Sequence, residues 1–532
     1  MGLLEEITPQ TYRAALNSAQ AGEWLAAMKK EFDGCLEQSV WTLVKRDSLP
    51  ADTNIIPVKW VFKIKTDETG KITKFKARIT PKGFKQRYGI DFFEVFANTG
   101  KYKSLRTMLS IAAQRDMELR QLDVPQAFTQ AKLDEVVYME MPQGFEVPGM
   151  VCLLNKSLYG LKQSPRNWYK LVSAFIVNEL GFTACVSDPC LFYKKSKSGD
   201  PIMLFLFVDD MQIGFDARNR AEYKRVHAAL KKRFNITSLG ESKFMLGMRI
   251  TRDRRARTIK LDQELYVTKA LERFGLQECR TERTPAVTHS DAVVVDPTPT
   301  NVKEFQEKVG TLLYAAISTR PDISFAVNQL TQRMQSPTLS DAKACDRVFR
   351  YLAGTRDQGL LFGRSVDQQS ITVYADADWG SDKRDRKSIT GWIAMVNGDP
   401  VSWASKKQKV VAQSTCEAEL YAEAAAINEA KWLEGLLIEL GLPTKEVPLV
   451  LGDNQSTQKL SENDIKSERT KHVDIKYHYV QDEVQNKRIR LQWIPTSEQL
   501  ADILTKSLGG PLHKQLRSQL LVRVESQLQG GC

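Results

Sequence analysis

The chain has 532 residues and a formal net charge of +12, because 76 lysines and arginines outnumber 64 aspartates and glutamates. This length predicts several domains with sizeable cores, and the positive charge favours a polyanionic partner, nucleic acid before an anionic membrane surface. From the hydropathy of the sequence we expect neither a membrane span nor a signal peptide. The eight cysteines form no CxxC pair, so we expect reduced thiols in a cytosolic or nuclear compartment.

The N-terminal segment, residues 1–50, has the pattern of an amphipathic helix that leads into an extended piece. Its apolar face is predicted from a spacing of four residues, in Trp24, Met28, Phe32 and Leu36. A hairpin follows from Lys59, with its turn at 68–70. Its strands are strongly basic and carry Lys59, Lys63, Lys65, Lys71, Lys74, Lys76 and Arg78. Aromatic residues alternate with these cations, which favours a surface that grips phosphates and stacks on bases over a merely solvated strand face.

Two adjacent carboxylates, Asp209 and Asp210, follow a continuously apolar run from Ile202 to Val208 and precede a second short apolar run. This pattern predicts a buried β-hairpin with both acids at its turn. Like charges this close repel each other unless a cation neutralises them, so a divalent metal ion is favoured over an ordinary acidic turn. Two hard cations need a further carboxylate, for which Asp123, at the end of a short predicted strand after a helix at 104–114, is the candidate.

The middle of the chain supplies fewer chemical signals. A glycine-bearing loop at 159–165 precedes a helix, and residues 236–250 are predicted to return as strands around Gly240 and Gly247. A cationic stretch, 249–260, suits the backbone of a nucleic-acid duplex. Prolines and threonines at 284–303 predict a linker, and helices follow.

A second set of carboxylates lies in the last third of the chain. A three-stranded meander begins with a strand that carries Asp376, and a long helix starts at a capping box of Ser414 and Glu417, which leaves Glu419 free for metal. Asp453 ends another apolar strand, and Asp502 falls in a predicted final helix. Each acid alone has a structural explanation, but the four together predict a second metal site.

Eight motifs follow one another along the first half of the chain: KWVFKIK, the KAR at 76–78, GFKQRYGIDFFEVFA, QLDVPQAF, VYMEMPQGF, SLYGLKQSPRNWY, SDPCLF and LFVDDM. Their order and spacing resemble those of the reverse transcriptase of copia-type long-terminal-repeat retrotransposons, and the resemblance extends from about residue 10 to 510. The resemblance is to the reverse transcriptase and ribonuclease H portion of the Pol polyprotein. It implies an α+β fold, in which a right-hand polymerase of fingers, palm and thumb precedes a connection region and a ribonuclease H-like domain.

The resemblance divides the chain as follows: an N-terminal helical lead-in at 1–50, fingers and palm at 51–215, the remaining palm and thumb at 216–283, a linker at 284–303, connection helices at 304–368, the ribonuclease H-like domain at 369–510 and a C-terminal tail at 511–532. Its implied catalytic and metal-binding residues are Asp123, Asp209 and Asp210 in the polymerase and Asp376, Glu419, Asp453 and Asp502 in the nuclease. Its implied nucleotide-binding residues are Lys65, Arg78, Phe128, Tyr159 and Gly160. Leu246, Gly247 and Met248 would hold the primer, although a plain hairpin explains them equally well. His472 and His478 receive no role.

The implied function is RNA-directed DNA synthesis together with degradation of the RNA strand of RNA–DNA hybrids. Each active site would hold two Mg²⁺, with Mn²⁺ as an alternative. Expected partners are an RNA template, a DNA primer, RNA–DNA hybrid and dNTPs, with no membrane. Association with a second copy or with the element's integrase stays open, and the expected location is the cytoplasm, in a virus-like particle, or the nucleus.

The chain departs from the family pattern at 79–81, 98–100 and 125–126. Pro81 and Pro125 bear on the backbone near Arg78 and Asp123. These departures favour an alternative function, a degenerate or domesticated remnant that binds nucleic acid without catalysis.

Overall fold

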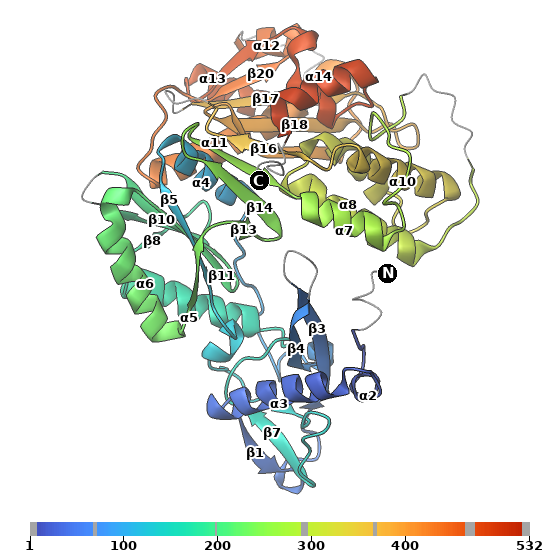
Figure 1. Ribbon diagram of the computed structural model, residues 1–532. Helices are drawn as coiled ribbons and strands as arrows, with labels where there is room; N and C mark the ends of the chain where they lie inside the picture. The colour runs from blue at the N-terminus through green and yellow to red at the C-terminus, as the bar shows by residue number, and fades with distance from the viewer. Residues whose placement is uncertain are drawn as a thin grey trace, which may run out of the picture.

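The computed structural model describes residues 8–66, 72–196, 199–288, 296–364, 370–462 and 474–523. Figure 1 shows an N-terminal lobe at the bottom, a sheet with covering helices at the left, a helical group at the right and a C-terminal domain across the top. The described residues form both α-helices and β-sheets, which confirms the predicted α+β class. Within the described residues, no helix combines the length and apolar character that a bilayer crossing needs.

The N-terminal lobe packs two helices against a small sheet and a long hairpin. Its elements are α2 (Tyr12–Leu16), α3 (Ala21–Glu37), β1 (Trp41–Lys45), η1 (Arg46–Ser48), β2 (Ile55–Ile56), β3 (Val58–Thr66), β4 (Ile72–Pro81), η2 (Gly83–Lys85), β6 (Tyr138–Met139) and β7 (Met150–Leu154). Trp24 and Met28 of α3 are buried as predicted, but Leu36 is 47% exposed. Cys35 takes the buried position instead, because 3.6 residues per turn bring position 35, eleven residues after Trp24, back to the same face.

A six-stranded sheet in the order β12-β5-β11-β10-β9-β8 forms the centre of the first half. Its strands are β5 (Glu118–Asp123), β8 (Thr183–Ala184), β9 (Leu191–Lys195), β10 (Pro201–Phe207), β11 (Asp210–Phe215) and β12 (Thr237–Glu241). Two helices, α5 (Ser164–Asn178) and α6 (Arg220–Phe234), share one core with it through Trp168, Val172 and Phe234. The short 3₁₀ helices η3 (Ala127–Gln130) and η4 (Ala217–Asn219) flank this sheet.

A five-stranded sheet, β13-β14-β15-β16-β22, joins the two halves of the chain. Its strands are β13 (Phe244–Met245), β14 (Met248–Asp253), β15 (Thr258–Asp262), β16 (Gln358–Phe362) and β22 (Leu521–Arg523). Beside it lie α7 (Glu264–Arg273), α8 (Val302–Ser318), η5 (Pro321–Ile323), α9 (Ser324–Thr331) and α10 (Leu339–Ala353), which share a separate core.

Two predicted boundary segments contain regular pairing. The described part of the linker at 284–303 pairs with the start of α10, where Leu339 N donates to Thr298 O at 2.8 Å, and residues 289–295 lie outside the described residues. The predicted tail contains α14 (Gly510–Leu520) and β22, whose backbone pairs with β16, and residues 524–532 lie outside the described residues. The leucine spacing of α14 buries Leu516 and Leu520, and so holds the described part of this segment on the core.

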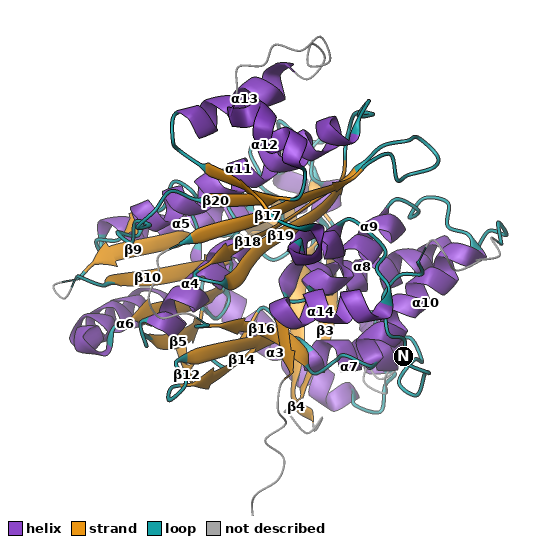
Figure 2. Ribbon diagram, turned by 90° about the horizontal axis from the view of Figure 1, so that it is seen from above, coloured by secondary structure: helices purple, strands orange, loops and turns teal. Residues whose placement is uncertain are grey.

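The C-terminal domain is built on a sheet in the order β19-β18-β17-β20-β21. Its strands β17 (Ile371–Asp378), β18 (Ile389–Val396) and β19 (Asp399–Lys407) are antiparallel, which confirms the predicted meander, whereas β20 (Leu449–Gly452) and β21 (Arg490–Trp493) are added in parallel. The 25-residue helix α11 (Thr415–Glu439) runs along this sheet (Figure 2). The remaining elements are α12 (Gln455–Glu462), α13 (Asp474–Gln485), η7 (Thr496–Glu498) and η8 (Leu500–Leu504).

One hydrophobic core continues from the first half into the C-terminal domain through α4 (Tyr102–Gln114). Leu105, Met108 and Leu109 of α4 belong to the same buried cluster as Val373 and Ile393 of the C-terminal sheet. Polar groups reinforce this contact, because the buried guanidinium of Arg106 donates to the carbonyl oxygens of Ile317, Ser318 and Val401 at 2.6 to 2.8 Å. The two halves are therefore packed directly on each other.

Candidate active sites

The first carboxylate cluster consists of Asp123, Asp209 and Asp210, and the backbone brings its members together. Asp123 ends β5, Asp210 begins β11, and the two are register partners in the antiparallel ladder. The turn between β10 and β11 contains Val208, with φ of +56°, and Asp209. Val124 N donates to Asp209 O at 3.0 Å, which fixes this turn beside the end of β5. The predicted hairpin with both acids at its turn is confirmed.

Three residues that were predicted to bind nucleotide lie beside this cluster. The Arg78 guanidinium lies 4.2 Å from the centre of the Tyr159 ring, and the Phe128 ring lies 4.4 Å from it on a tilted approach. The Tyr159 hydroxyl donates to Asp209 Oδ2 at 3.5 Å. Burial, with Asp209 nearby, raises the pKa of Tyr159 above its usual range, so the hydroxyl stays a donor at neutral pH. Lys65 lies on β3, but its side chain is outside the described residues.

Position 160 requires a glycine, because of its own backbone conformation and the atoms that lie close to it. Its φ is +111°, and a Cβ at this position would lie 2.4 Å from the Pro81 carbonyl oxygen and 2.6 Å from Thr80 Cγ2. The unusual residues Thr80 and Pro81 therefore form one wall of the loop that carries Tyr159 and Gly160. Arg78 keeps its regular pairing with Val61, so Pro81 leaves the strand intact at Arg78.

Sequence reasoning missed Glu31, which lies near Arg78 and Tyr159. Glu31 lies on α3, one turn after Met28, and accepts a hydrogen bond from Gln126 Nε2 at 3.4 Å. Burial raises the pKa of Glu31, although Lys76 and Arg78 oppose this effect. One sequence feature could have identified Glu31: it is a charged residue seven positions after Trp24, on the same face of the helix as the apolar residues. Gln126, in the departure at 125–126, has a left-handed backbone with φ of +52°, while Asp123 keeps its register.

The predicted primer-binding residues form the turn between β13 and β14. Leu246 and Gly247 both have positive φ, and the Tyr314 hydroxyl donates to the Leu246 carbonyl oxygen. Met248 begins β14, pairs with Met245 and is fully buried, so Leu246 and Gly247 are the members of this set that form the turn itself.

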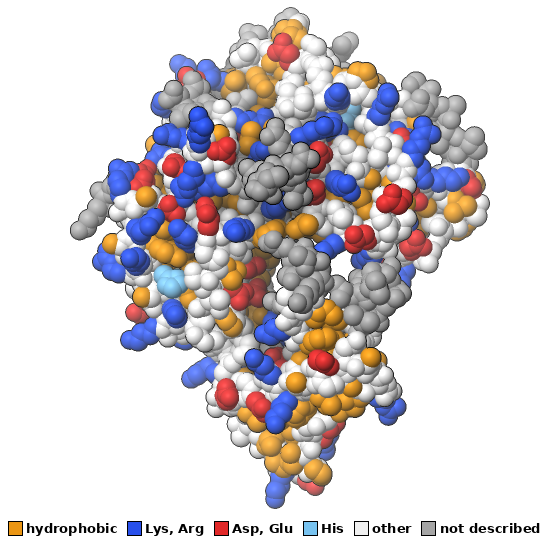
Figure 3. All heavy atoms as spheres, in the orientation of Figure 1, with side chains coloured by type: hydrophobic (Ala, Val, Ile, Leu, Met, Phe, Trp, Pro, Cys, Tyr) orange, Lys and Arg blue, Asp and Glu red, His pale blue; other side chains and the backbone are white. Residues whose placement is uncertain are grey.

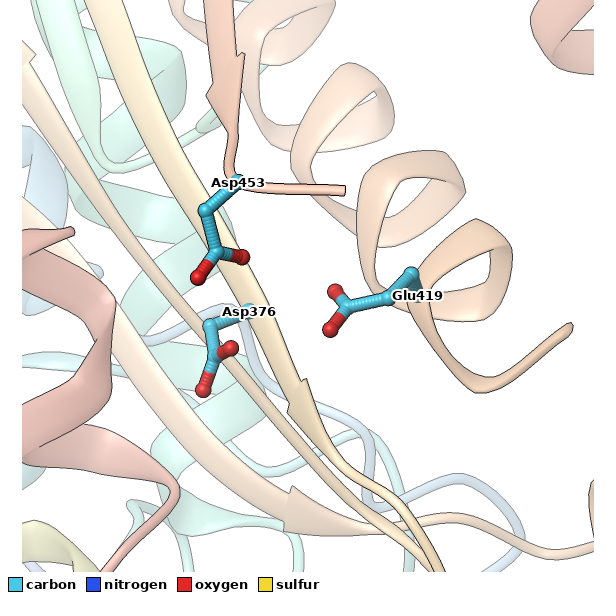
Figure 4. Close-up of side chains that lie close together, drawn as sticks. All are labelled: Asp376, Glu419 and Asp453. Carbon is cyan, nitrogen blue, oxygen red and sulfur yellow. The ribbon is translucent and has the colours of Figure 1, made fainter. Parts of the chain in front are cut away.

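The second carboxylate cluster consists of Asp376, Glu419 and Asp453. Each residue offers an oxygen, and the three oxygens lie within 4.8 Å of one another (Figure 4). Asp376 lies on β17, Asp453 directly follows the neighbouring parallel strand β20, and Glu419 lies in the second turn of α11. Among the described residues, this is the one group of three metal-ligating side chains that converges so closely. The carboxylate oxygens of the first cluster do not converge to this degree.

The electrostatics of the second cluster are those of buried like charges. Burial raises the pKa of Glu419 well above its usual range, and Asp376 and Asp453 add to the effect. Burial and Asp376 also raise the pKa of Asp502, to about 7. Three hard oxygen donors from three separate elements fit a divalent cation such as Mg²⁺, which would relieve this repulsion.

Asp502 is near this cluster but outside the converging trio. The residue was predicted to lie on an α-helix, yet it lies on the 3₁₀ helix η8, which Gln499 caps by accepting from Ala501 N. Gln499 Nε2 also donates to the Ala375 carbonyl oxygen at 2.9 Å, so a tertiary contact to β17 replaces the predicted first α-helical turn. Asp502 instead bonds Lys506, which also reaches Asp376.

The capping box at the start of α11 is confirmed in one half. Ser414 accepts from Glu417 N as predicted, but Glu417 reaches past the cap to accept from Gln413 N at 2.7 Å. This hydrogen bond still turns Glu417 away from the cluster and leaves Glu419 facing it. His478 is exposed, with its ring 5.3 Å from that of Tyr477, and His472 lies outside the described residues.

Sequence reasoning also missed Glu423 and Lys506. Glu423 lies one turn after Glu419 and is 2% exposed, and its Oε1 accepts from Thr457 Oγ1 at 2.5 Å. Burial raises the pKa of Glu423 to about 8. The spacing of four from a proposed ligand, on a helix that is otherwise rich in alanine, was the available signal for Glu423, and the same spacing relates Lys506 to Asp502.

Residues 38–288 match the family described as reverse transcriptase (RNA-dependent DNA polymerase). The chain is 38% identical over 509 residues to the retrovirus-related Pol polyprotein from transposon TNT 1-94 of Nicotiana tabacum, covering 94% of this chain and 38% of that protein. It is 35% identical over 518 residues to the Pol polyprotein from transposon RE1 of Arabidopsis thaliana, covering 96% of this chain and 34% of that protein. The chain thus spans little more than a third of the length of these relatives.

Similar solved structures include a foamy viral protease-reverse transcriptase in complex with dsDNA. That structure has a TM-score of 0.46 and 13% identity, and the match covers 89% of this chain and 83% of that one. The N-terminal RNase H domain of a Mycobacterium tuberculosis protein matches 28% of this chain and 96% of its own, with a TM-score of 0.20 and 14% identity. The family and the relatives confirm the resemblance that the motifs indicated: the chain carries a reverse transcriptase domain and is related along most of its length to copia-type retrotransposon Pol polyproteins.

Proposed function

We propose that this chain is the RNA-directed DNA polymerase and ribonuclease H part of a copia-type Pol polyprotein, with one active site at each carboxylate cluster. The observation that carries the proposal is that the fold brings acids together from distant parts of the chain twice. Asp123 pairs with Asp210 beside the turn that carries Asp209, and Asp376, Glu419 and Asp453 converge from β17, α11 and the end of β20. The substrates would be an RNA template, a DNA primer and dNTPs at the first cluster, and an RNA–DNA hybrid at the second.

At the first cluster, Asp123, Asp209 and Asp210 would hold Mg²⁺, which would activate the primer hydroxyl and neutralise the leaving pyrophosphate. Arg78 is fixed against the Tyr159 ring and has its charge available for a triphosphate. The Tyr159 hydroxyl orients Asp209, and Phe128 forms an apolar wall against that ring, where a sugar would rest. Gly160 lets the loop approach the base pair without a side chain in the way.

At the second cluster, Asp376, Glu419 and Asp453 would hold Mg²⁺, and Asp502 would complete the set. The bound ion would supply Lewis acidity for attack of water on the RNA strand. Buried Asp376 and Glu419 exclude bulk water from one side of this site, and Asp453 lies at its more open edge. Selection of RNA would depend on the shape and 2′-hydroxyls of that strand, so little sequence preference is expected.

The surface agrees with a polyanionic substrate. Figure 3 shows lysine and arginine side chains spread over the lobe that contains α6 and the six-stranded sheet. The basic hairpin β3–β4 and the cationic stretch 249–260 belong to the same half of the chain. Nucleic-acid binding with strong salt dependence is therefore part of the proposal.

Two assays on the full chain test the two activities separately. The Asp209→Asn variant should lose primer extension on a poly-rA template, and undiminished synthesis by this variant would remove Asp209 from the active site. The Asp453→Asn variant should lose release of labelled RNA from a hybrid, whereas Asp209→Asn should keep it. A wild-type chain that binds hybrid but performs neither reaction with Mg²⁺ or Mn²⁺ would favour the non-catalytic remnant.

A further inference from the structure

Lys506 lies inside the second active site. Its ammonium Nζ is 2.8 Å from Asp502 Oδ1 and 3.2 Å from Asp376 Oδ1. The two carboxylate side chains are 6% and 1% exposed, while the lysine side chain is 32% exposed. The lysine side chain is therefore partly exposed to solvent, while its ammonium contacts two buried carboxylates.

Asp376 is bonded through both of its oxygens. The Thr505 hydroxyl donates to Oδ2, and Lys506 donates to Oδ1. Asp376 is also a member of the trio whose oxygens lie within 4.8 Å of one another, whereas Asp502 is not. The site thus has two parts that share Asp376: the trio of carboxylates, and the pair of Asp376 and Asp502, which the Lys506 ammonium already bridges.

We propose that Lys506 is a built-in cation of this site. Its ammonium occupies the position between Asp376 and Asp502, so that one divalent ion binds readily at the trio and a second binds between Asp376 and Asp502 only when the ammonium moves aside. The inference rests on the proposed nuclease function, because that function is what requires divalent ions here.

The physical reason is the charge that the fold buries in this site. Buried carboxylates without a counter-ion repel each other and destabilise the folded chain. A lysine four residues after Asp502 supplies a positive charge that needs no ion from solution, on a flexible stem that can withdraw to the solvent. Lys506 thereby keeps the metal-free site folded. A divalent ion can bind between Asp376 and Asp502 only by displacing the lysine ammonium.

The test counts Mn²⁺ bound to the full chain by electron paramagnetic resonance, in an Asp209→Asn, Asp210→Asn background that removes ion binding at the first cluster. Lys506→Met, which keeps the length of the side chain but not its charge, is compared with Lys506→Arg and with Lys514→Met. Lys514 is an exposed lysine on α14 and serves as the matched control.

Lys506→Met is expected to bind a second Mn²⁺ about tenfold more tightly than the parent. In EDTA its melting temperature should be lower by about 2 to 4 °C, and Mn²⁺ should restore it. Lys506→Arg and Lys514→Met should resemble the parent in both measurements. If Lys506→Met is unfolded in EDTA, its refolding by Mn²⁺ supports the proposal, and failure of Mn²⁺ to refold it overturns the proposal.

An unchanged Mn²⁺ isotherm in a folded Lys506→Met variant would also overturn the proposal, because a lysine with a purely structural role would alter the melting temperature alone. RNA release by the wild-type chain is measured in parallel. Absence of that activity would reject the nuclease function, while the Mn²⁺ count still decides whether Lys506 competes with a divalent ion.

Discussion

Asp123 and Asp210 face each other as register partners across the antiparallel ladder of β5 and β11. The pairing places two acids from positions 87 residues apart at the same end of the sheet, next to the turn that carries Asp209. Two carboxylates in this position gain little for the fold, because like charges directly opposite each other on a ladder are destabilising. A shared divalent ion, as proposed for this cluster, would offset this repulsion.

Asp210→Asn should abolish primer extension without unfolding the chain. We expect synthesis to fall by at least about 100-fold, because one oxygen ligand of the proposed ion is replaced by a neutral amide. Asp216→Asn, at the other end of the same strand, is the control and should extend primers normally, since Asp216 caps η4. RNA release from a hybrid should be unaffected in both variants, and its loss in Asp210→Asn would show that the substitution damages the whole chain.

Gly160→Ala should damage the nucleotide pocket through the backbone. The new methyl group would meet the Pro81 carbonyl oxygen at 2.4 Å, and φ of +111° disfavours any residue with a Cβ. We expect a raised KM for dNTPs and a loss of about 1 to 3 kcal/mol in the free energy of unfolding. Gly441→Ala is the control, because Gly441 also has positive φ, +74°, but has open space around it. Equal effects of the two variants on KM would argue against a role for the contact with Pro81.

The sequence was sufficient to predict most of what depends on local pattern. The hairpin at Asp209 and Asp210 and the strand that ends at Asp123 follow from apolar runs that stop at acids, and the strand that carries Asp376 follows from alternating apolar and polar residues. The two errors have different causes. Leu36 is exposed because the true helical period places Cys35 in the core instead, whereas Asp502 lies on a 3₁₀ helix because Gln499 bonds the backbone of β17. Glu31 and Lys506 were missed because Glu31 meets Gln126, and Lys506 meets Asp376, only through packing of separate elements.

Arg106→Met should destabilise both halves of the chain together. The substitution removes the donors for three buried carbonyl oxygens at the contact between α4, α8 and β19, which should cost about 2 to 4 kcal/mol of the free energy of unfolding. Arg115→Met is the control, since Arg115 makes a partly exposed ion pair with Asp200 beyond the end of the same helix and should contribute no more than about 1 kcal/mol. Urea denaturation, with both activities followed at each concentration, measures the effect. Loss of one activity well before the other would contradict a single shared core.

Glu423→Gln should make the chain more stable at alkaline pH. The pKa of Glu423 is raised to about 8 in the folded chain, above its ordinary value of 4.5, so its carboxyl is favoured in the neutral form by the fold. For an acid whose pKa is raised by folding, its contribution to stability is full below the unfolded pKa and declines as the pH rises towards 8, because the unfolded chain releases the proton first.

Glutamine retains an oxygen that can accept from Thr457 but never carries the charge. In EDTA, the free energy of unfolding of Glu423→Gln should match that of the wild type near pH 4.5 and exceed it increasingly up to pH 8.5, by up to about 4 kcal/mol, as measured by urea denaturation at each pH. Glu498→Gln, at an exposed glutamate of the same domain, should show no such divergence. A constant difference between Glu423→Gln and wild type over this range would mean that Glu423 is charged in the folded chain and that an unrecognised cation lies beside it.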